Sequence, residues 1–249
     1  MQISGKGVFV SGGASGIGKA TALELGRRGA RVVVADMDEA GGKAVVDAIE
    51  AEGGEAVFQR CDVTRPEDLA SAFEACKSTF GRFDIAFNNA GIAGEDIFEP
   101  DGKLWERVLD IDLRAVMDAT RQEILLMRGT GGGVIVNTAS MGGLVPMAGS
   151  PTYAAAKAGV VHFTRSLAGL GAESNIRVNA VCPTFTDTPL VRRNGDERLE
   201  ELKAMVGGIL QPEDVAAGVV ELIEDDSRAG AIMRVTVRGG RDYARELRG

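Results

Sequence analysis

Short apolar runs alternate along this chain with longer segments in which apolar residues recur every three or four positions. The short runs predict buried strands, and the longer spacing predicts amphipathic helices. Strands are predicted at residues 7–10, 31–35, 56–60, 83–87, 134–138, 177–182 and 231–237. Helices are predicted after residue 18 and at residues 38–52, 66–80, 105–128, 151–174 and 212–225.

Strands that are joined by helices pair in parallel, because the chain needs a crossover connection to return to the same edge of a sheet. No proline- or serine-rich linker divides the sequence. We therefore predict a single α/β domain over residues 1–249, with a Rossmann-type, doubly wound, mostly parallel seven-stranded sheet and helices on both faces.

Polar residues follow the ends of several predicted strands. They are Asp36, Asp62, Asn88, Ser140 and residues 184–188. Parallel strands share one carboxyl edge, where open α/β sheets bind their ligands. We expect the functional residues to meet at that edge.

A glycine-rich segment, S-G-G-A-S-G-I-G, follows the first predicted strand and precedes a helix. Gly12, Gly16 and Gly18 would let the backbone turn sharply and let a pyrophosphate approach the amides of the helix. Their spacing differs from the commoner G-x-G-x-x-G. The segment alone is equally consistent with a tight strand-to-helix turn.

Asp36 ends the second strand, at nearly the spacing of about 20 residues expected for a ribose-binding carboxylate. Its charge would accept hydrogen bonds from ribose hydroxyls and repel a 2′-phosphate. Ser15 and Met37 are uncharged where a basic residue could hold that phosphate. This pattern favours NAD over NADP, and the alternative is that Asp36 only caps the following turn. Asp62 likewise could bind the adenine or cap the helix that begins near Pro66.

Tyr153 and Lys157 lie one turn apart on the predicted helix 151–174 and therefore share a face. A neighbouring ammonium group lowers the pKa of a phenol, so this pair is a candidate acid/base. Ser140 adds a hydroxyl from the preceding loop. His162 falls on the opposite face of the helix, where a packing or surface role is expected.

Composition limits the possible partners. The net charge is −8, which argues against nucleic acid or an anionic membrane. No apolar run is long enough to span a bilayer, and the first residues do not resemble a signal peptide. Cys61, Cys76 and Cys182 form no CxxC pair and have no histidines at ligand spacing, so we expect reduced thiols, no metal site and a cytoplasmic location.

Residues 188–210 are predicted to form a lid over the substrate. A charged stretch there is followed by apolar residues at helical spacing, namely Leu199, Leu202, Met205, Val206 and Ile209. An ordinary surface helix would give the same stripe. The polar, basic tail from residue 238 is expected to be disordered or to reach a neighbouring subunit.

Together these motifs resemble the short-chain dehydrogenase/reductase family over nearly the whole chain. The family's nucleotide turn matches Gly12, Gly16 and Gly18, with Ser11 in place of its threonine, and its Asn-Asn-Ala-Gly is present at residues 88–91. The resemblance places the catalytic residues at Ser140, Tyr153 and Lys157, with Asp112 at the fourth position. It places NAD against Gly12, Ser15, Gly16, Ile17, Gly18, Asp36, Met37, Asp62, Val63, Asn89, Ala90, Gly91, Tyr153, Lys157, Pro183, Thr184, Phe185 and Thr188.

Within the family, residues 222–226 and 230–234 are similar to 15-hydroxyprostaglandin dehydrogenases. This similarity implies NAD-dependent oxidation of a hydroxyl group on an apolar substrate. Gly149 and Ser150 stand where those enzymes have glutamines close to the substrate, so a prostaglandin is poorly supported.

Two positions depart from the family pattern. Asp112 replaces an asparagine whose main chain holds a water linked to the lysine, and a carboxylate there should raise the pKa of Lys157. Thr184 replaces a glycine and has less backbone freedom near the nicotinamide.

The expected function is hydride transfer between NAD(H) and a secondary alcohol or ketone, with a small hydroxy or oxo compound as substrate. One alternative is a 3-oxoacyl-carrier-protein reductase, and another is a non-catalytic NAD(H)-binding sensor. By family resemblance we expect a homodimer or homotetramer that associates through the helices at residues 105–128 and 151–174.

Overall fold

The computed structural model describes residues 1–93, 104–193 and 195–245. One sheet runs through the described chain, in the order β3-β2-β1-β4-β5-β6-β7-β8. Its parallel strands are β1 (Gly7–Ser11), β2 (Arg31–Asp36), β3 (Glu55–Arg60), β4 (Ile85–Asn88), β5 (Gly133–Thr138), β6 (Ile176–Pro183) and β7 (Ile232–Thr236). The strand order reverses direction between β1 and β4, which is where a doubly wound sheet opens a crevice for a ligand.

The prediction of seven strands was wrong by one. Residues 240–243 form β8 (Gly240–Tyr243), which pairs antiparallel with β7. Gly240 has a φ of 64° and allows the tight return of the chain. The Arg234 side chain pairs across the two strands with Asp242, and Tyr243 packs against the core. This part of the basic tail is therefore the last strand of the chain's single described sheet, and it is not disordered.

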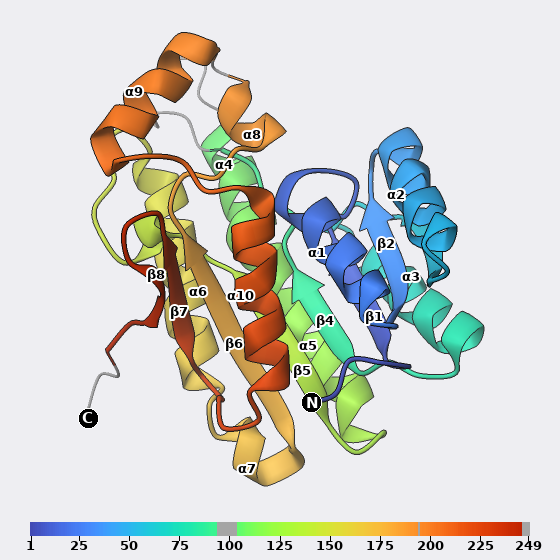
Figure 1. The fold of residues 1–249 in the computed structure, drawn as a ribbon. Helices are drawn as coiled ribbons and strands as arrows, with labels where there is room; N and C mark the ends of the chain where they lie inside the picture. Colours follow the sequence, from blue (N-terminus) through green and yellow to red (C-terminus); the bar gives the residue numbers. More distant parts are fainter. Residues whose placement is uncertain (94–103, 194, 246–249) are drawn as a thin grey trace.

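Helices cover both faces of the sheet (Figure 1). They are α1 (Gly16–Arg27), α2 (Glu39–Ala51), α3 (Pro66–Phe80), α4 (Leu104–Leu109), α5 (Ala115–Arg128), α6 (Pro151–Ser166), α7 (Leu170–Ser174), α8 (Pro189–Arg192), α9 (Asp196–Val206) and α10 (Pro212–Glu224). Two short segments join them, the π-helical η1 (Asp110–Arg114) and the 3-10 segment η2 (Met141–Gly143).

Two predicted helices are divided in the structure. The helix expected at residues 105–128 contains the π-helical turn η1 between α4 and α5. The helix expected at residues 151–174 ends at Ser166, and α7 follows as a separate turn that ends on the left-handed Asn175. Helical periodicity continues through both interruptions, so the sequence pattern does not reveal them.

Two apolar layers hold the helices to the sheet. One face of the central strands packs against α1, α2 and α10, and the other packs against α3, α5 and α6. Val8 and Val10 of β1 belong to the first layer, whereas Phe9 between them belongs to the second. Because side chains alternate between the two faces and helices cover both, apolar residues fill the faces of the sheet. Polar side chains can then gather at its carboxyl edge. No helix in the described residues is long and apolar enough to cross a membrane.

Candidate active site

The turn between β1 and α1 requires glycine for reasons of backbone geometry. Gly12 and Gly16 have φ values of 63° and 52°, in the left-handed region that strains other residues. A Cβ atom on Gly18 would lie 2.0 Å from the carbonyl oxygen of Gly12. Ser15 and Ile17 flank the first residue of α1, and the Ser15 side chain does not cap the first amides of this helix. These residues fit the phosphates of a dinucleotide.

The Asn-Asn-Ala-Gly segment after β4 fixes this turn. Ser11 Oγ accepts hydrogen bonds from the amides of Asn89 and Ala90, at 2.9 and 3.2 Å. The side-chain amide of Asn89 donates to the carbonyls of Ser11 and Gly12, at 3.1 and 3.3 Å. The ends of two neighbouring strands are thereby held together beneath the glycine turn.

Asp36 lies beside the glycine turn at the end of β2. Its Oδ2 accepts a hydrogen bond from the Ala14 amide at 3.0 Å, and its Oδ1 accepts one from the Asp38 amide at 3.0 Å. The carboxylate thus fixes the local turn, as the alternative interpretation proposed, and it is at the same time held at the carboxyl edge. Neighbouring Ser15 and Met37 are exposed and carry no charge.

Asp62 and Val63 follow β3 at the same edge. Asp62 Oδ1 accepts hydrogen bonds from the amide and the hydroxyl of Thr64, at 3.0 and 2.7 Å. Arg65, and not Asp62, is the residue that precedes α3. Asp62 therefore closes a turn before the helix and does not cap it, which excludes one of the two alternatives considered for this residue.

Ser140, Tyr153 and Lys157 come together where β5 leads into α6. Lys157 Nζ lies 5.6 Å from the centre of the Tyr153 ring. Ser140 lies close enough to Tyr153 to act in the direction of a lower Tyr153 pKa, and its hydroxyl accepts a hydrogen bond from the Gly142 amide at 3.1 Å. The structure thus brings the three candidate acid/base side chains together.

Beneath this cluster, Lys157 is held from two sides. Its Nζ donates to the carbonyl of Thr138 at 2.9 Å and lies 3.6 Å from Asp112 Oδ1. Asp112 Oδ1 also accepts a hydrogen bond from the Ile92 amide at 3.1 Å. Both charged side chains are buried, with 3% of Lys157 and none of Asp112 exposed.

Burial and charge determine how these groups hold their protons. Burial raises the pKa of Tyr153 above its ordinary value, although the Lys157 ammonium acts in the opposite direction. Burial alone would lower the pKa of Lys157, but the charges of Asp112 and Tyr153 outweigh it and raise that pKa, as predicted for a carboxylate at position 112. Burial also raises the pKa of Asp112, against the charge of Lys157.

The segment after β6 completes the edge. Pro183 ends the strand, and the amide of Thr184 donates to the carbonyl of Val235 at 2.9 Å. Asn175 is the one non-glycine residue with positive φ in the described chain, so Thr184 in place of glycine causes no strain of this kind. Phe185 follows, and the Thr188 methyl group lies beside Gly16, where a Cβ atom would approach it to 3.0 Å.

The sequence interpretation missed a buried polar cluster below the site. Asn88 Nδ2 donates to Glu123 Oε2 and to Asn137 Oδ1, both at 3.0 Å. Burial raises the pKa of Glu123 to about 8. Glu123 continues the inward stripe of Asp112, Val116 and Ala119 at helical spacing, and that pattern could have revealed it. His162 is exposed, on the face opposite Tyr153 and Lys157, as predicted.

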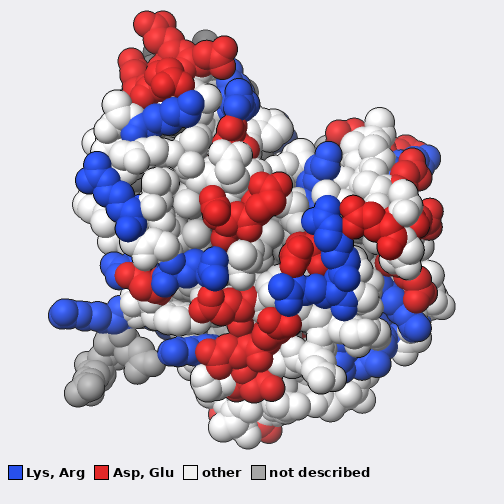
Figure 2. Space-filling view, in the orientation of Figure 1, with Lys and Arg blue, Asp and Glu red and all other residues white. Residues whose placement is uncertain are grey.

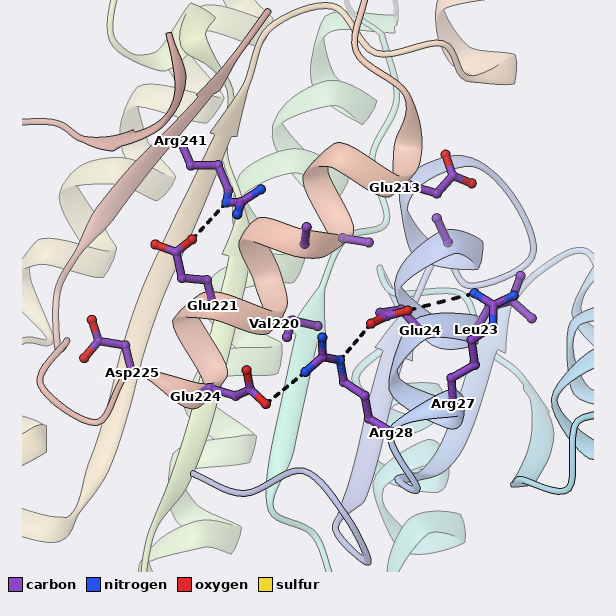
Figure 3. A pocket seen from close by; sticks show the side chains of 13 residues that line it. Leu23, Glu24, Arg27, Arg28, Glu213, Val220, Glu221, Glu224, Asp225 and Arg241 are labelled. Carbon is purple, nitrogen blue, oxygen red and sulfur yellow. Dashed lines mark hydrogen bonds and ion pairs between the residues drawn. The ribbon is translucent and has the colours of Figure 1, made fainter.

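A groove of about 730 Å³ lies away from this cluster, between α1 and α10 (Figure 3). Its floor is formed by small and aliphatic residues, and its walls by exposed ion pairs such as Arg28 with Glu24 and Glu224, and Arg241 with Glu221. None of the predicted site residues lines it. The candidate active site is therefore the acid/base cluster and not this groove.

Comparisons with known proteins identify relatives that match most of the chain. The family model described as short chain dehydrogenase matches residues 6–199. A 15-hydroxyprostaglandin dehydrogenase (NAD+) of Mus musculus is 38% identical over 257 residues, which cover 96% of this chain and 93% of the relative. A cyclohexanol dehydrogenase of Acinetobacter sp. (strain SE19) is 40% identical over 228 residues, which cover 91% of this chain and 90% of the relative. The crystal structure of levodione reductase superimposes with a TM-score of 0.86 at 29% identity, covering 94% of this chain and 96% of that chain.

Proposed function

The chain belongs to the short-chain dehydrogenase/reductase family, and we propose that Ser140, Tyr153 and Lys157 carry out its reaction. It is an NAD-dependent oxidoreductase of secondary alcohols and ketones. The observation that supports the proposed roles is the contact of Lys157 with Tyr153 and of Tyr153 with Ser140, next to a glycine turn that fits a dinucleotide.

In this proposal Tyr153 removes the hydroxyl proton during oxidation and returns it during reduction. The Lys157 ammonium stabilises the phenolate, because an opposite charge nearby favours the ionised form. Ser140 donates a hydrogen bond that positions the substrate oxygen. The bound NAD supplies the redox chemistry by accepting the hydride.

The same edge provides the residues that would hold NAD. The glycine turn and the start of α1 would bind the pyrophosphate. Asp36 would accept hydrogen bonds from the ribose hydroxyls and repel a 2′-phosphate, and its anchoring by the Ala14 amide supports this role. Asp62, Val63, Asn89, Ala90, Gly91 and the segment from Pro183 to Thr188 would contact the remaining parts of the cofactor.

We propose an apolar substrate. Met141 and Leu144, which follow Ser140, are half-buried against the apolar cluster that also contains Val116 and Val160. They place aliphatic and thioether surface next to the catalytic hydroxyls. The named activities of the relatives, on cyclohexanol and on a hydroxyprostaglandin, are compatible with such a surface.

We also propose that α8 and α9 form a lid. The ends of this segment are fixed to each other by the pairing of Thr186 with Leu210. Leu199 and Leu202 of α9 are buried, whereas Met205 has 66% of its surface exposed. Acidic side chains gather over α9 in Figure 2. The helix is thus apolar inward and charged outward, and Met205 leaves one apolar side chain exposed on it.

A panel of substrates with NAD and NADP tests the function. We expect NADH formation from apolar secondary alcohols such as cyclohexanol, with little reaction when NADP replaces NAD. Faster reduction of a 3-oxoacyl thioester with NADPH would support the 3-oxoacyl-carrier-protein reductase instead. Tight NADH binding without turnover of any alcohol would support a sensor.

Assembly and location complete the proposal. The outer face of α4 and α5 exposes Trp105, Met117 and Leu125. These exposed apolar residues on two consecutive helices support a homodimer or homotetramer that associates there. The three cysteines are buried and unpaired, which supports a cytoplasmic location.

A further inference from the structure

Asp112 is one of the two residues at which this site departs from the family pattern, and its surroundings are those of a charged group. It lies in the π-helical turn η1, a feature that often marks functional sites. Its Oδ1 is shared between Lys157 Nζ and the Ile92 amide. Its Oδ2 is buried and has no hydrogen-bond partner among the described residues. The compensation of its charge therefore depends on Lys157.

The loop after β4 leaves space for this ion pair. A Cβ atom on Gly91 would lie 2.6 Å from Asp112 Oδ1 and 3.6 Å from Lys157 Nζ. Only a residue without a side chain allows the loop to approach the pair so closely. The contact between Asp112 and Lys157 is thus supported by three elements, namely η1, α6 and the loop.

We propose that Asp112 is a positioning residue that acts through Lys157, and that its carboxylate sets the pH range in which Tyr153 gives up its proton. The inference rests on the proposed catalytic role of Tyr153. An asparagine would offer Lys157 the same oxygen without the negative charge. Compared with asparagine, Asp112 therefore favours the protonated, cationic form of Lys157 and disfavours the phenolate form of Tyr153.

The direction of the effect follows from the groups that face the pair. Lys157 on α6 favours the Tyr153 phenolate, whereas Asp112 on η1 and Cys182 on β6 disfavour it. Asp112 also raises the pKa of Lys157. Removing the charge of Asp112 should therefore lower the pKa of both Tyr153 and Lys157.

The tyrosine content of the chain makes a direct test possible. The sequence has 2 tyrosines, Tyr153 and Tyr243. In a Tyr243→Phe background, the ultraviolet absorbance of tyrosinate reports on Tyr153 alone and requires neither cofactor nor turnover. We expect Asp112→Asn to lower the titration midpoint of Tyr153 by on the order of one pH unit.

Asp110→Asn in the same background is the matched control. Asp110 lies in the same turn, but 47% of its side chain is exposed and it pairs with Arg114. We expect this variant to keep the midpoint of the background protein. In a second measurement, the rising limb of kcat against pH for alcohol oxidation should move to lower pH in Asp112→Asn and stay in place in Asp110→Asn.

Each outcome of these measurements either supports or overturns the proposed role of Asp112. An unchanged Tyr153 midpoint in a folded Asp112→Asn protein would overturn the proposal, whatever its turnover. If that variant does not fold, Asp112→Ser, which is smaller and equally uncharged, carries the same expectation. Failure of both to fold would also overturn it, because Asp112 would then be required for the structure and not for the charge at Lys157. Absence of alcohol turnover in the parent protein, together with the expected shift of the Tyr153 midpoint, would contradict only the proposed function.

Discussion

At the scale of single residues, the glycine turn shows why side chains are excluded from the floor of the cofactor site. Gly12 and Gly16 adopt left-handed backbone, and Gly18 faces the carbonyl of Gly12. These are separate constraints on three positions in one turn. A substitution at Gly18 tests whether the glycine turn contacts the cofactor, without altering any charged group.

We predict that Gly18→Ala weakens NADH binding at least about tenfold, which corresponds to about 1.4 kcal/mol. The new Cβ would lie 2.0 Å from a backbone oxygen, so the turn itself must move. Isothermal titration calorimetry with NADH measures the effect. Gly129→Ala is the control, because its Cβ would meet only one atom, at an ordinary 3.6 Å. Equal affinity in the two variants would show that the turn does not contact the cofactor.

At the scale of elements, a polar cluster joins β4, β5 and α5 beneath the active site. Asn88 reaches both Glu123 and Asn137. Glu123 Oε1 and Asn88 Oδ1 are buried acceptors without a partner among the described residues. A proton on Glu123 converts one of these acceptors into a donor. Burial, which raises the pKa of Glu123 to about 8, favours that proton at neutral pH.

The proton on Glu123 makes the free energy of unfolding depend on pH. The unfolded chain ionises Glu123 near its ordinary value, whereas the folded protein keeps the proton up to about pH 8. The protonated Glu123 therefore stabilises the folded protein fully at a pH below its pKa in the unfolded chain. This stabilisation is lost as the pH rises through its pKa in the folded protein. Each unit of difference between the two values corresponds to about 1.4 kcal/mol.

We predict that Glu123→Gln is more stable than the parent protein at pH 8 by a few kcal/mol, on the order of the full shift. Glutamine keeps an acceptor for Asn88 Nδ2 and adds a donor without ionising. Urea unfolding at pH 5 and pH 8 measures the difference, which should be much smaller at pH 5. Glu74→Gln, on the exposed side of α3, should match the parent at both values. The prediction is contradicted if Glu123→Gln and the parent lose stability equally between the two.

At the scale of the whole molecule, the sequence was sufficient for a doubly wound, mostly parallel sheet and for the residues at the carboxyl ends of its strands. Apolar runs and helical spacing are local patterns, and the ends of parallel strands share one edge of the sheet. β8 was missed because its four residues, G-R-D-Y, are held by ion pairs and by an edge strand, and such partners are not visible in the periodicity. Glu123 was missed because a carboxylate in an apolar stripe was not expected to be buried.

Assembly is also a property of the whole molecule, and it is testable on the face of α5. Leu125 has 56% of its surface exposed, and we expect that surface to be covered by a second copy. Leu125→Asp should therefore convert the protein to a monomer in light scattering after size exclusion. Val237→Asp, at another exposed apolar residue, should leave the assembly unchanged. A parent protein that is already monomeric would refute the proposed interface.

The central claim is that Tyr153 is the group that exchanges the substrate proton. The most direct measurement is turnover of an apolar secondary alcohol with NAD by Tyr153→Phe, together with NADH binding by the same protein. Phenylalanine keeps the ring beside Lys157 and removes only the hydroxyl, so the cofactor site is left in place. We predict a loss of at least about a hundredfold in kcat, the usual contribution of a positioned acid/base, with near-normal NADH affinity. Turnover close to that of the parent protein would contradict the assignment.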